Sequence, residues 1–447
     1  MSQEQSRKRS KQNAFGGSSY IPSVKKQKSL TATTSIPKTT DASSISFLLC
    51  SSVPLLFVIR LKLNDDANNG FKKGNFVCSP FSLEIVLGML AFGAEGETLK
   101  QLLEFLGHES MHHLRSMSTV SKLLENILVE NTGQGGLVVH IANGVWVDKK
   151  LKPVKSCYQK VLKNVYKTEA NYIDIQNQRA QSVERINSWV KEKTNGLIPG
   201  IVDNFRPDDA IVFVNAVYFK GTWSKPFDAK NTKNKDFHLI NGEKVSIRFM
   251  TSYKEFGYGS FQGYQMIELP YANEGQSNKF SMYIFLPHAK DGLQDLLQLF
   301  HSDHSLFYGD FNLTMRKLNE LWIPKFEISC TFNARDEMKQ MGLTLPFTKE
   351  NKELTGIVNQ KFLNEEMLYV SKILQKSFIK VDESGTEAAV TTRLRIRRTT
   401  SACRKPVKFM ADHPFMFMIR ENNSRVVFFS GVVIDPSQKK FFSGCYC

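Results

Sequence analysis

Two stretches contain the residue types and spacings most suggestive of chemistry. The first matches a zinc-binding motif. His108-Glu109-Ser110-Met111-His112 matches H-E-x-x-H, in which two histidines on one helical face bind zinc and the glutamate acts as a base. Gly107 precedes the pattern and ends the apolar run 102–106, as a helix C-terminus would. We therefore interpret the stretch as a polar connector and assign no metal ligand, while a metalloprotease that uses His108 and His112 is our third functional hypothesis.

The second stretch, Gly385–Lys408, combines a strand pattern with the densest arginine cluster outside the N-terminal tail. A period of two side chains is typical of a strand with one buried face. At ~3.3 Å per residue, a strand over Thr386–Arg398 would be roughly 40 Å long, enough to cross a sheet. Two interpretations fit this pattern: a segment that is exposed in one state and inserted into a sheet in another, or a permanent edge strand that ends in a basic loop, which the pattern alone favours. The small and apolar set is Thr386, Ala388, Val390, Thr392, Leu394 and Ile396, and the interleaved set is Glu387, Ala389, Thr391, Arg393, Arg395 and Arg397.

The rest of the body, from residue 75 to 436, alternates helical and strand-like patterns without a long linker or repeat. This mixture without a regular βαβ order predicts the α+β fold class. No G-x-S-x-G motif or phosphate-binding glycine loop is present, so we predict no catalytic residue and no cofactor. Helices are expected within 82–106 with a break near Gly93, and over 118–127 and 179–193; strands are expected over 137–147, 211–219, 280–286, 321–328 and 426–434.

Composition excludes several classes of protein. The chain has 447 residues, 41 % of them hydrophobic and 23 % charged, which excludes collagen, coiled coil and wholesale disorder. Its net charge is +16, and residues 1–44 contain eight basic and two acidic side chains. We predict that 1–44 is a disordered basic tail. Its two basic clusters, residues 7–11 and 25–28, fit a nuclear-import receptor or nucleic acid; the alternative is a solvated tail.

The sequence also bears on the compartment. The first 44 residues contain no apolar segment of the kind found in secretory signals. Residues 45–61 are apolar but shorter than the ~20 residues of a bilayer helix, and Pro54 interrupts them, so we expect a buried segment and no membrane span. The seven scattered cysteines include no C-x-x-C pair, which argues against a disulfide framework. We therefore predict a location in the cytoplasm, the nucleus or both. We also expect a monomer.

Several motifs, in order along residues 75–436, carry a family resemblance. Val381-Asp382-Glu383-Ser384-Gly385-Thr386-Glu387-Ala388-Ala389 resembles the hinge of the reactive-centre loop of serpins. Three segments are most similar in sequence to plant serpins: Ala142-Asn143-Gly144-Val145-Trp146, Asn187-Ser188-Trp189 and Thr194-Asn195-Gly196-Leu197-Ile198. Three further segments agree with the family: Asn75-Phe76-Val77-Cys78-Ser79-Pro80-Phe81-Ser82, residues 213–223 from Phe213 to Trp223, and residues 412–436 from Asp412-His413-Pro414-Phe415 to Pro436.

The resemblance implies a serpin fold with a large, mostly antiparallel sheet A, two smaller sheets and eight or nine helices. Serpin inhibitors offer the loop to a protease as bait. Once the acyl-enzyme forms, the cleaved loop inserts into sheet A as a new strand and carries the protease with it, which slows deacylation. The expected organisation is a tail 1–44, a serpin domain 45–436 with its loop at about 383–408, and a C-terminal tail 437–447.

The resemblance also assigns roles to individual residues. Bulk or charge at Thr386, Ala388 or Val390 would stall insertion, whereas Leu394 and Ile396 should fall on the buried face and the arginines should face solvent. Gln375 stands where the family usually has a histidine, so the geometry of its hydrogen bonds should differ. The implied hinge is Glu383, Gly385, Thr386, Glu387, Ala388 and Ala389. The implied shutter, the group of polar residues beneath sheet A, is Ser79, Ser82, Asn215 and Gln375. The implied residue of the breach, where sheet A opens, is Trp223.

Two counts place the scissile bond one residue apart. Counting forward from Glu383 gives Thr399–Thr400, whereas counting back from Pro414 with plant-type spacing gives Arg398–Thr399. We favour Arg398, because a long cation can anchor in an acidic specificity pocket; Arg397–Arg398 is an overlapping alternative. Residues 395–398 also read R-x-R-R, a dibasic pattern. The implied target is a trypsin-like serine protease or an Arg-specific cysteine protease, such as a metacaspase-like enzyme.

Two functional hypotheses therefore lead. The first is a suicide-substrate protease inhibitor of the serpin type. The second is a non-inhibitory serpin that is cleaved as a substrate and binds acidic partners or nucleic acid through its basic tail and loop. A denaturing gel separates them, because only the inhibitor forms a boil-stable adduct with its protease.

Overall fold

The computed structural model describes residues 74–116, 119–130, 137–151, 153–273, 277–303, 305–358, 368–386, 407–438 and 442–444. All of them belong to one compact unit, residues 41–447. The basic tail 1–44, the apolar segment 45–61 and the loop residues 387–406, with Arg398 and Thr399 among them, lie outside the described residues. The domain boundaries expected at 44, 45 and 436 therefore stay predictions.

A Ser-Pro pair begins the most buried helix, α3 (Pro80–Phe92). Ser79 is its N-cap and accepts a hydrogen bond from the Ser82 N–H, while Pro80 occupies the first turn, where no donor is needed. Almost every side chain of α3 is buried. The described residues contain nine α-helices: α3, α4 (Gly96–Leu106), α5 (Met111–Ser116), α6 (Thr119–Glu130), α7 (Ser156–Asn164), α8 (Arg179–Lys193), α9 (Leu293–Ser302), α10 (Ser305–Tyr308) and α11 (Arg335–Gln340).

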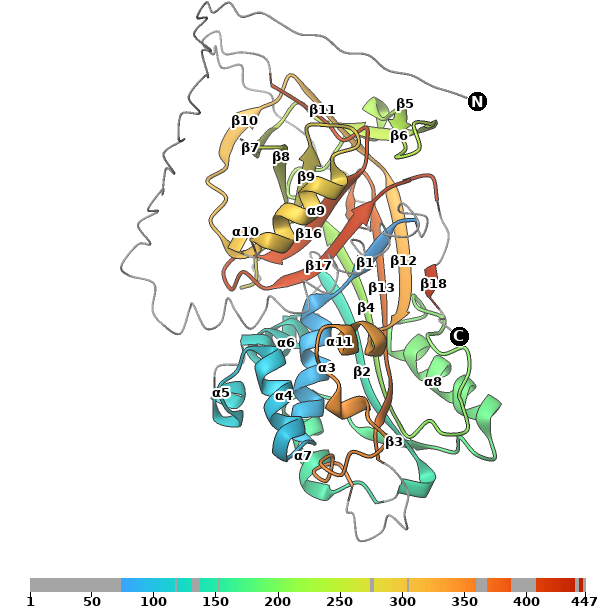
Figure 1. Cartoon of the computed structure of the whole chain (residues 1–447). Coiled ribbons are helices and arrows are strands. Elements are labelled where there is room, and N and C mark those ends of the chain that lie inside the picture. Colours follow the sequence, from blue (N-terminus) through green and yellow to red (C-terminus); the bar gives the residue numbers. More distant parts are fainter. Residues whose placement is uncertain are drawn as a thin grey trace, which may run out of the picture. The chain divides into compact units, whose positions relative to one another are not determined.

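Two of the three sheets lie in the upper part of the view in Figure 1. The first has seven strands in the order β1-β17-β16-β9-β8-β7-β10 and is antiparallel throughout. The second has four strands in the order β15-β11-β6-β5. The bounds are β1 (Phe76–Cys78), β5 (Lys233–His238), β6 (Lys244–Thr251), β7 (Glu255–Ser260), β8 (Tyr264–Pro270), β9 (Phe280–Pro287), β10 (Thr314–Lys317), β11 (Glu320–Pro324), β15 (Lys408–Met410), β16 (Phe415–Glu421) and β17 (Val427–Val433).

The third sheet, which we call sheet A, has the order β18-β12-β13-β4-β2-β3, with β14 paired to β4. Its two central strands, β4 and β13, run parallel and pair from Ile211↔Val370 to Tyr218↔Phe378. Antiparallel pairs flank them on both sides, β2 with β4 and β12 with β13. The bounds are β2 (Val138–Asp148), β3 (Ala170–Ile173), β4 (Ile211–Thr222), β12 (Phe326–Asn333), β13 (Val370–Val381), β14 (Gly385–Thr386) and β18 (Phe442–Gly444).

Sheet A is covered on both faces. Phe213, Val217 and Phe219 of β4 face the main core, which also contains α3. The alternate residues Val214 and Tyr218 face a second cluster, which contains Ile186 and Val190 of α8. Figure 1 shows α8 beside the lower half of the sheet. Because both faces are apolar and covered, the parallel central pair is a buried seam.

Most of the predicted elements are confirmed, including the helix over 179–193 and the break at Gly93 between α3 and α4. The prediction of one strand over 321–328 is wrong. The run is two strands of different sheets, β11 ending at Pro324 and β12 beginning at Phe326. Pro324 has no N–H for a ladder, and the Lys325 N–H bonds to the carbonyl of Arg248, so the chain changes sheets there.

Candidate functional site

The hinge begins with a tight turn at the upper end of β13. The Asp382 N–H donates to the Gly385 carbonyl, at 2.9 Å, and the Gly385 N–H returns a bond of 3.3 Å to Asp382. The chain therefore reverses direction, and Gly385 and Thr386 pair antiparallel with Thr222 and Gly221 of β4. The start of the loop already runs in the direction that a strand inserted beside β4 must take.

Gly385 is required at this turn for lack of space. Its φ is +151°, and a Cβ added there would lie 2.0 Å from the Gly221 oxygen and 2.7 Å from the Thr222 Cα. Both atoms belong to the backbone of β4 and cannot move aside. Only glycine allows the returning chain to approach β4 this closely.

Trp223 connects the upper end of β4 to the hinge turn, where the breach was expected. Its indole Nε1–H donates to the Asp382 carbonyl, and its backbone N–H donates to the Ser384 carbonyl, both at 2.9 Å. The ring is buried and stacks on Tyr271 with centroids 4.6 Å apart. Trp223 thus ties the hinge to β4 by two hydrogen bonds and an aromatic contact.

Glu383 fixes the turn from the other side. Its carboxylate pairs with the Lys325 ammonium at 2.6 Å and accepts a 2.7 Å bond from the Thr232 hydroxyl. Burial alone would raise the pKa of Glu383, but the hydrogen bonds from Lys325 and Thr232 outweigh burial, and the pKa is lower than usual. Lys325 precedes β12, so the ion pair links the hinge to the strand on the far side of β13.

We expect Glu383→Gln to lower the free energy of unfolding by about 1–3 kcal/mol at pH 7, because it removes a charge-assisted hydrogen bond. A carboxyl group with a lowered folded pKa stabilises the fold above its unfolded pKa, and that stabilisation is lost as the pH falls through the folded pKa. The difference between the two proteins should therefore shrink below about pH 4. Thermal unfolding at pH 7 and pH 3.5 measures it, and an equal difference at both pH values would contradict the role of the ion pair.

The four residues expected to form the shutter lie together in one buried hydrogen-bonded chain. The Gln375 Oε1 accepts from the Ser79 N–H, and its Nε2 donates to the Ser79 carbonyl, both at 2.9 Å. Nε2 also lies 3.3 Å from the Asn215 Oδ1, across the parallel seam. The chain continues from Ser79 to Ser82, whose hydroxyl groups are 3.0 Å apart. The chain therefore joins α3, β13 and β4.

The amide at position 375 explains how the shutter is satisfied without a histidine. An amide donates and accepts at the same time, so one side chain bonds both backbone groups of Ser79. Asn143 on β2 extends the chain, because its Oδ1 accepts from the Asn215 Nδ2 at 2.7 Å. Three amides on three strands, those of Gln375, Asn215 and Asn143, are therefore joined in one chain.

We expect Gln375→Ala to destabilise the protein by about 2–5 kcal/mol. It leaves the Ser79 N–H and the Asn215 amide oxygen buried without their partner, at about 1–3 kcal/mol each. Gln298→Ala, at an exposed position on α9, is the matched control and should change stability by less than about 0.5 kcal/mol. Similar unfolding midpoints for the two variants would contradict the structural role of the chain.

The two histidines of the H-E-x-x-H pattern do not share a helix. Gly107 ends α4 in the left-handed conformation, at φ 73°, and His108 lies beyond it, whereas His112 belongs to α5. The Nδ1 atoms of His108 and His113 are 3.4 Å apart, and burial, together with His113, lowers the pKa of His108 to about 4. No group of three or more His, Cys, Asp or Glu residues suited to a metal was found among the described residues.

Sequence reasoning missed Lys325, Thr232 and Asn143. Lys325 and Thr232 lie 58 and 151 residues from Glu383, and no local pattern marks them as its partners. Asn143 carried a weak signal, as a polar residue inside a predicted strand. Among the helices of the described residues, none is long and apolar enough to cross a membrane.

Comparisons with known proteins agree with this geometry. The family model described as "Serpin (serine protease inhibitor)" matches residues 59–436. Serpin-Z10 of Arabidopsis thaliana is 39 % identical over 369 residues, which cover 81 % of this chain and 92 % of that protein. Serpin-ZX of the same plant is 36 % identical, covering 82 % and 93 %. The solved structure of Arabidopsis AtSerpin1 in its native stressed conformation has a TM-score of 0.78 and 33 % identity, covering 89 % of this chain and all of that one.

Sheet A thus has a parallel pair at its centre, and the glycine hinge that follows β13 folds back and pairs with β4. The chain belongs to the serpin family. The expected serpin fold is confirmed, and the resemblance to plant serpins is confirmed as well. Membership of the family supports protease inhibition by the serpin mechanism, with a protease as the partner; serpins are generally inhibitors and not catalysts.

Proposed function

We propose that this protein inhibits an Arg-specific protease as a suicide substrate cleaved at Arg398–Thr399. The target is a trypsin-like serine protease or an Arg-specific cysteine protease. The observation that carries the proposal is the antiparallel pairing of Gly385 and Thr386 with β4, beside the parallel seam. It gives the loop both a direction and a register from which insertion can start.

The register of β14 specifies where each loop residue would go. Thr386 is opposite Gly221, so each further step along the loop advances by one residue down β4. Continued in this way, Ala388 would lie opposite Phe219. Residues that are opposite in an antiparallel pair project from the same face. The members that would share the main-core face are Ala388 with Phe219, Val390 with Val217, Leu394 with Phe213 and Ile396 with Ile211, and all four of these β4 residues are fully buried.

Insertion requires β4 and β13 to separate. In an intact sheet they are direct neighbours, about 4.8 Å apart, and a new strand between them doubles that spacing. The Gln375–Asn215 contact crosses the seam and must break, which makes the shutter a control point of insertion. After insertion the sheet has two ladders of backbone hydrogen bonds, one on each side of the new strand, in place of the single ladder between β4 and β13. This gain drives insertion.

The covalent chemistry belongs to the protease. Its nucleophile adds to the carbonyl carbon of Arg398, the bond to the Thr399 nitrogen breaks, and that amine leaves with a proton from the protease. The loop is then joined to the body only at the hinge, and insertion carries the acylated Arg398 towards the lower end of β4. Distortion of the protease there slows hydrolysis of the acyl bond.

A denaturing gel tests the proposal. The intact protein is incubated with an equimolar trypsin-like protease, and in a second arm with an Arg-specific cysteine protease, then boiled and separated. We expect a band at the sum of the protease and the inhibitor without its C-terminal peptide, and mass spectrometry should find a released peptide that begins at Thr399. Complete cleavage near Arg398 without an adduct in either arm would contradict inhibition and favour the non-inhibitory alternative.

We further propose that the protein acts as a monomer in the cytoplasm or nucleus. Support for nuclear entry comes from the two basic clusters of the tail, which suit the acidic grooves of an import receptor. The tail fused to a fluorescent protein should accumulate in nuclei, and replacement of Arg7, Lys8 and Arg9 by alanine should reduce that accumulation. An unchanged distribution would contradict the role of the tail.

A further inference from the structure

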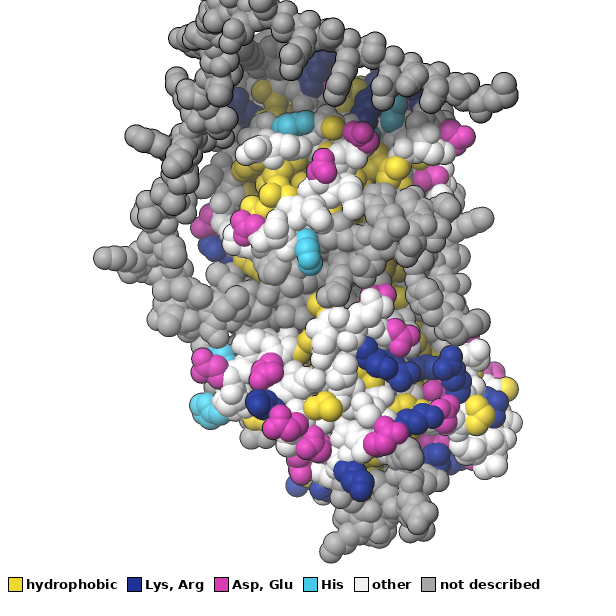
Figure 2. Space-filling view, in the orientation of Figure 1, with side chains coloured by type: hydrophobic (Ala, Val, Ile, Leu, Met, Phe, Trp, Pro, Cys, Tyr) yellow, Lys and Arg dark blue, Asp and Glu magenta, His cyan; other side chains and the backbone are white. Residues whose placement is uncertain are grey.

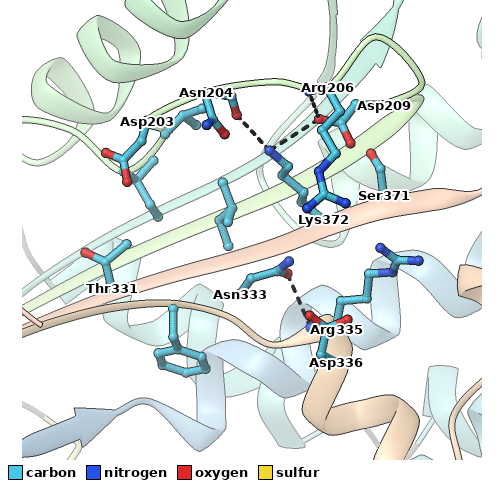
Figure 3. Close-up of a pocket in the computed structure, with 14 residues that line it drawn as sticks. Asp203, Asn204, Arg206, Asp209, Thr331, Asn333, Arg335, Asp336, Ser371 and Lys372 are labelled. Atoms are coloured by element: carbon cyan, nitrogen blue, oxygen red, sulfur yellow. Dashed lines mark hydrogen bonds and ion pairs between the residues drawn. The ribbon is translucent and has the colours of Figure 1, made fainter. Parts of the chain in front are cut away.

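A polar pocket lies at the lower end of sheet A, on the face covered by α8. It has a volume of about 120 Å³ and is bounded by the segment 201–209, which leads into β4, by the ends of β12 and β13, and by the start of α11. Figure 3 shows Arg206 reaching down from the upper segment and Arg335 rising from the start of α11. One water molecule needs about 10–15 Å³ of such space, so the pocket can hold a small ligand with its waters.

One ion pair at this pocket is already complete. The Lys372 ammonium lies 3.3 Å from the Asp209 carboxylate and donates a 2.7 Å bond to the Asn204 carbonyl. The other Asp209 contact is the Arg206 N–H, at 2.8 Å. Asp209 is buried, so these bonds satisfy it. Neither Lys372 nor Asp209 is left to bind a ligand strongly.

The remaining groups include the exposed carboxylates of Asp203 and Asp336, which are acceptors, and three side chains that present donors. Within the described residues, the Arg335 Nε–H is buried and has no hydrogen-bond partner, and the guanidinium of Arg335 makes one long bond of 3.5 Å, to the Phe347 carbonyl. The Arg206 guanidinium and the Asn333 Nδ2 have no partner among those residues. The Asn333 Oδ1 is already engaged by the Ile373 and Arg335 N–H groups. Two guanidinium groups and an amide nitrogen therefore face one small space.

We propose that this pocket binds a small oxyanion, a phosphate or a carboxylate, between Arg206 and Arg335. A guanidinium group presents paired N–H donors that match the oxygens of both anions. Exposed Asp203 and Asp336 also line the pocket, and Figure 2 shows acidic and basic side chains intermingled over the part of the molecule that holds α8 and α11. Their repulsion limits the affinity of the site for an anion.

An anion held there would resist the opening of sheet A. Arg206 belongs to the segment that leads into β4, whereas Arg335 lies two residues after the end of β12, which pairs with β13 along its whole length and should move with it. The anion therefore joins the two halves that must separate. This step rests on the proposed function, and it predicts that the anion slows loop insertion in the intact protein.

Inorganic phosphate is the probe for binding. The full chain is titrated with 0 to about 30 mM phosphate at constant ionic strength, by calorimetry and by the thermal unfolding midpoint. We expect saturable binding that weakens at least tenfold in Arg335→Gln and several-fold in Arg206→Gln. It should tighten about threefold in Asp336→Asn, and should be unchanged in Lys339→Gln, whose lysine is exposed on α11 outside the pocket. Acetate in a parallel titration distinguishes a carboxylate from a phosphate site.

Two results would overturn the site: binding that does not saturate, or binding that weakens equally in Arg335→Gln and Lys339→Gln. If Arg335→Gln does not fold, Arg206→Gln carries the same test, because Arg206 is exposed. The rate of adduct formation with a protease, measured with and without phosphate, tests the coupling. If no adduct forms under any condition, the proposed function fails while the binding result stands.

Discussion

Ala388→Arg is expected to convert the protein from an inhibitor into a substrate. If the loop inserts in the register that β14 sets, position 388 would lie opposite Phe219, which is fully buried and packs against Tyr271, Phe280 and Phe429 with ring centroids 5.0 to 6.0 Å apart. An unpaired guanidinium there costs several kcal/mol. A penalty of about 3 kcal/mol on the insertion step would slow it about 100-fold, long enough for the acyl-enzyme to hydrolyse.

The measurement for Ala388→Arg is the number of inhibitor molecules consumed for each protease inactivated. We expect that number to rise at least tenfold, with cleaved chain in place of adduct on the gel. Ala388→Thr is the control, because a small uncharged β-branched residue suits a strand and should still insert. An unchanged adduct yield for Ala388→Arg would contradict the register.

Arg398→Ala is expected to reduce the rate of association with a trypsin-like protease by at least about 100-fold. The arginine side chain supplies a charge-assisted, bidentate contact in an acidic specificity pocket, and alanine supplies none. Loss of about 3 kcal/mol of transition-state binding corresponds to this factor. The stability of the intact protein should not change.

Arg397→Ala is the matched control for Arg398→Ala, because it removes the same charge one residue away. A larger effect for Arg397→Ala would move the scissile bond to Arg397–Arg398. If neither variant slows association and the released peptide begins at Thr400, the bond is Thr399–Thr400 and the arginine preference is contradicted.

The hinge and the shutter show how much of the site could be predicted from sequence. The resemblance of residues 381–389 to the serpin hinge predicts a hinge at Gly385, and the structure explains the glycine by the Gly221 oxygen, against which any side chain would clash. Ser79, Ser82, Asn215 and Gln375 were expected together from family resemblance, and the structure places them in one hydrogen-bonded chain. Local motifs thus found the positions, while the bonds that join them depend on strand pairing.

Long-range contacts could not be predicted in the same way. The ion pair of Glu383 with Lys325 depends on β12 lying beside β13, which no local pattern encodes. The change of sheet at Lys325 was missed for the same reason, because an apolar run reads alike in either sheet. Which strands are neighbours, and which sheet a strand joins, depends on the topology of the whole fold.

The layers that cover both faces of sheet A also bear on the predicted solvent exposure of the loop arginines. The alternating pattern predicts that Arg393 and Arg395 face solvent after insertion. Continued from β14, however, they would lie opposite Val214 and Val212, which are buried in the cluster that contains α8. Full insertion therefore requires α8 or the segment after it to move away from sheet A. The sequence pattern alone does not indicate this requirement.

The stability of the protein before and after a single cut within its loop is the decisive comparison. The chain is nicked near residue 398, its two fragments are kept together, and both forms are heated under the same conditions. If the cut segment becomes a strand between β4 and β13, the nicked form should unfold more than about 10 °C above the intact form, because the new strand adds several kcal/mol of pairing and burial. Equal midpoints would show that the cut loop stays outside sheet A and would contradict the insertion mechanism.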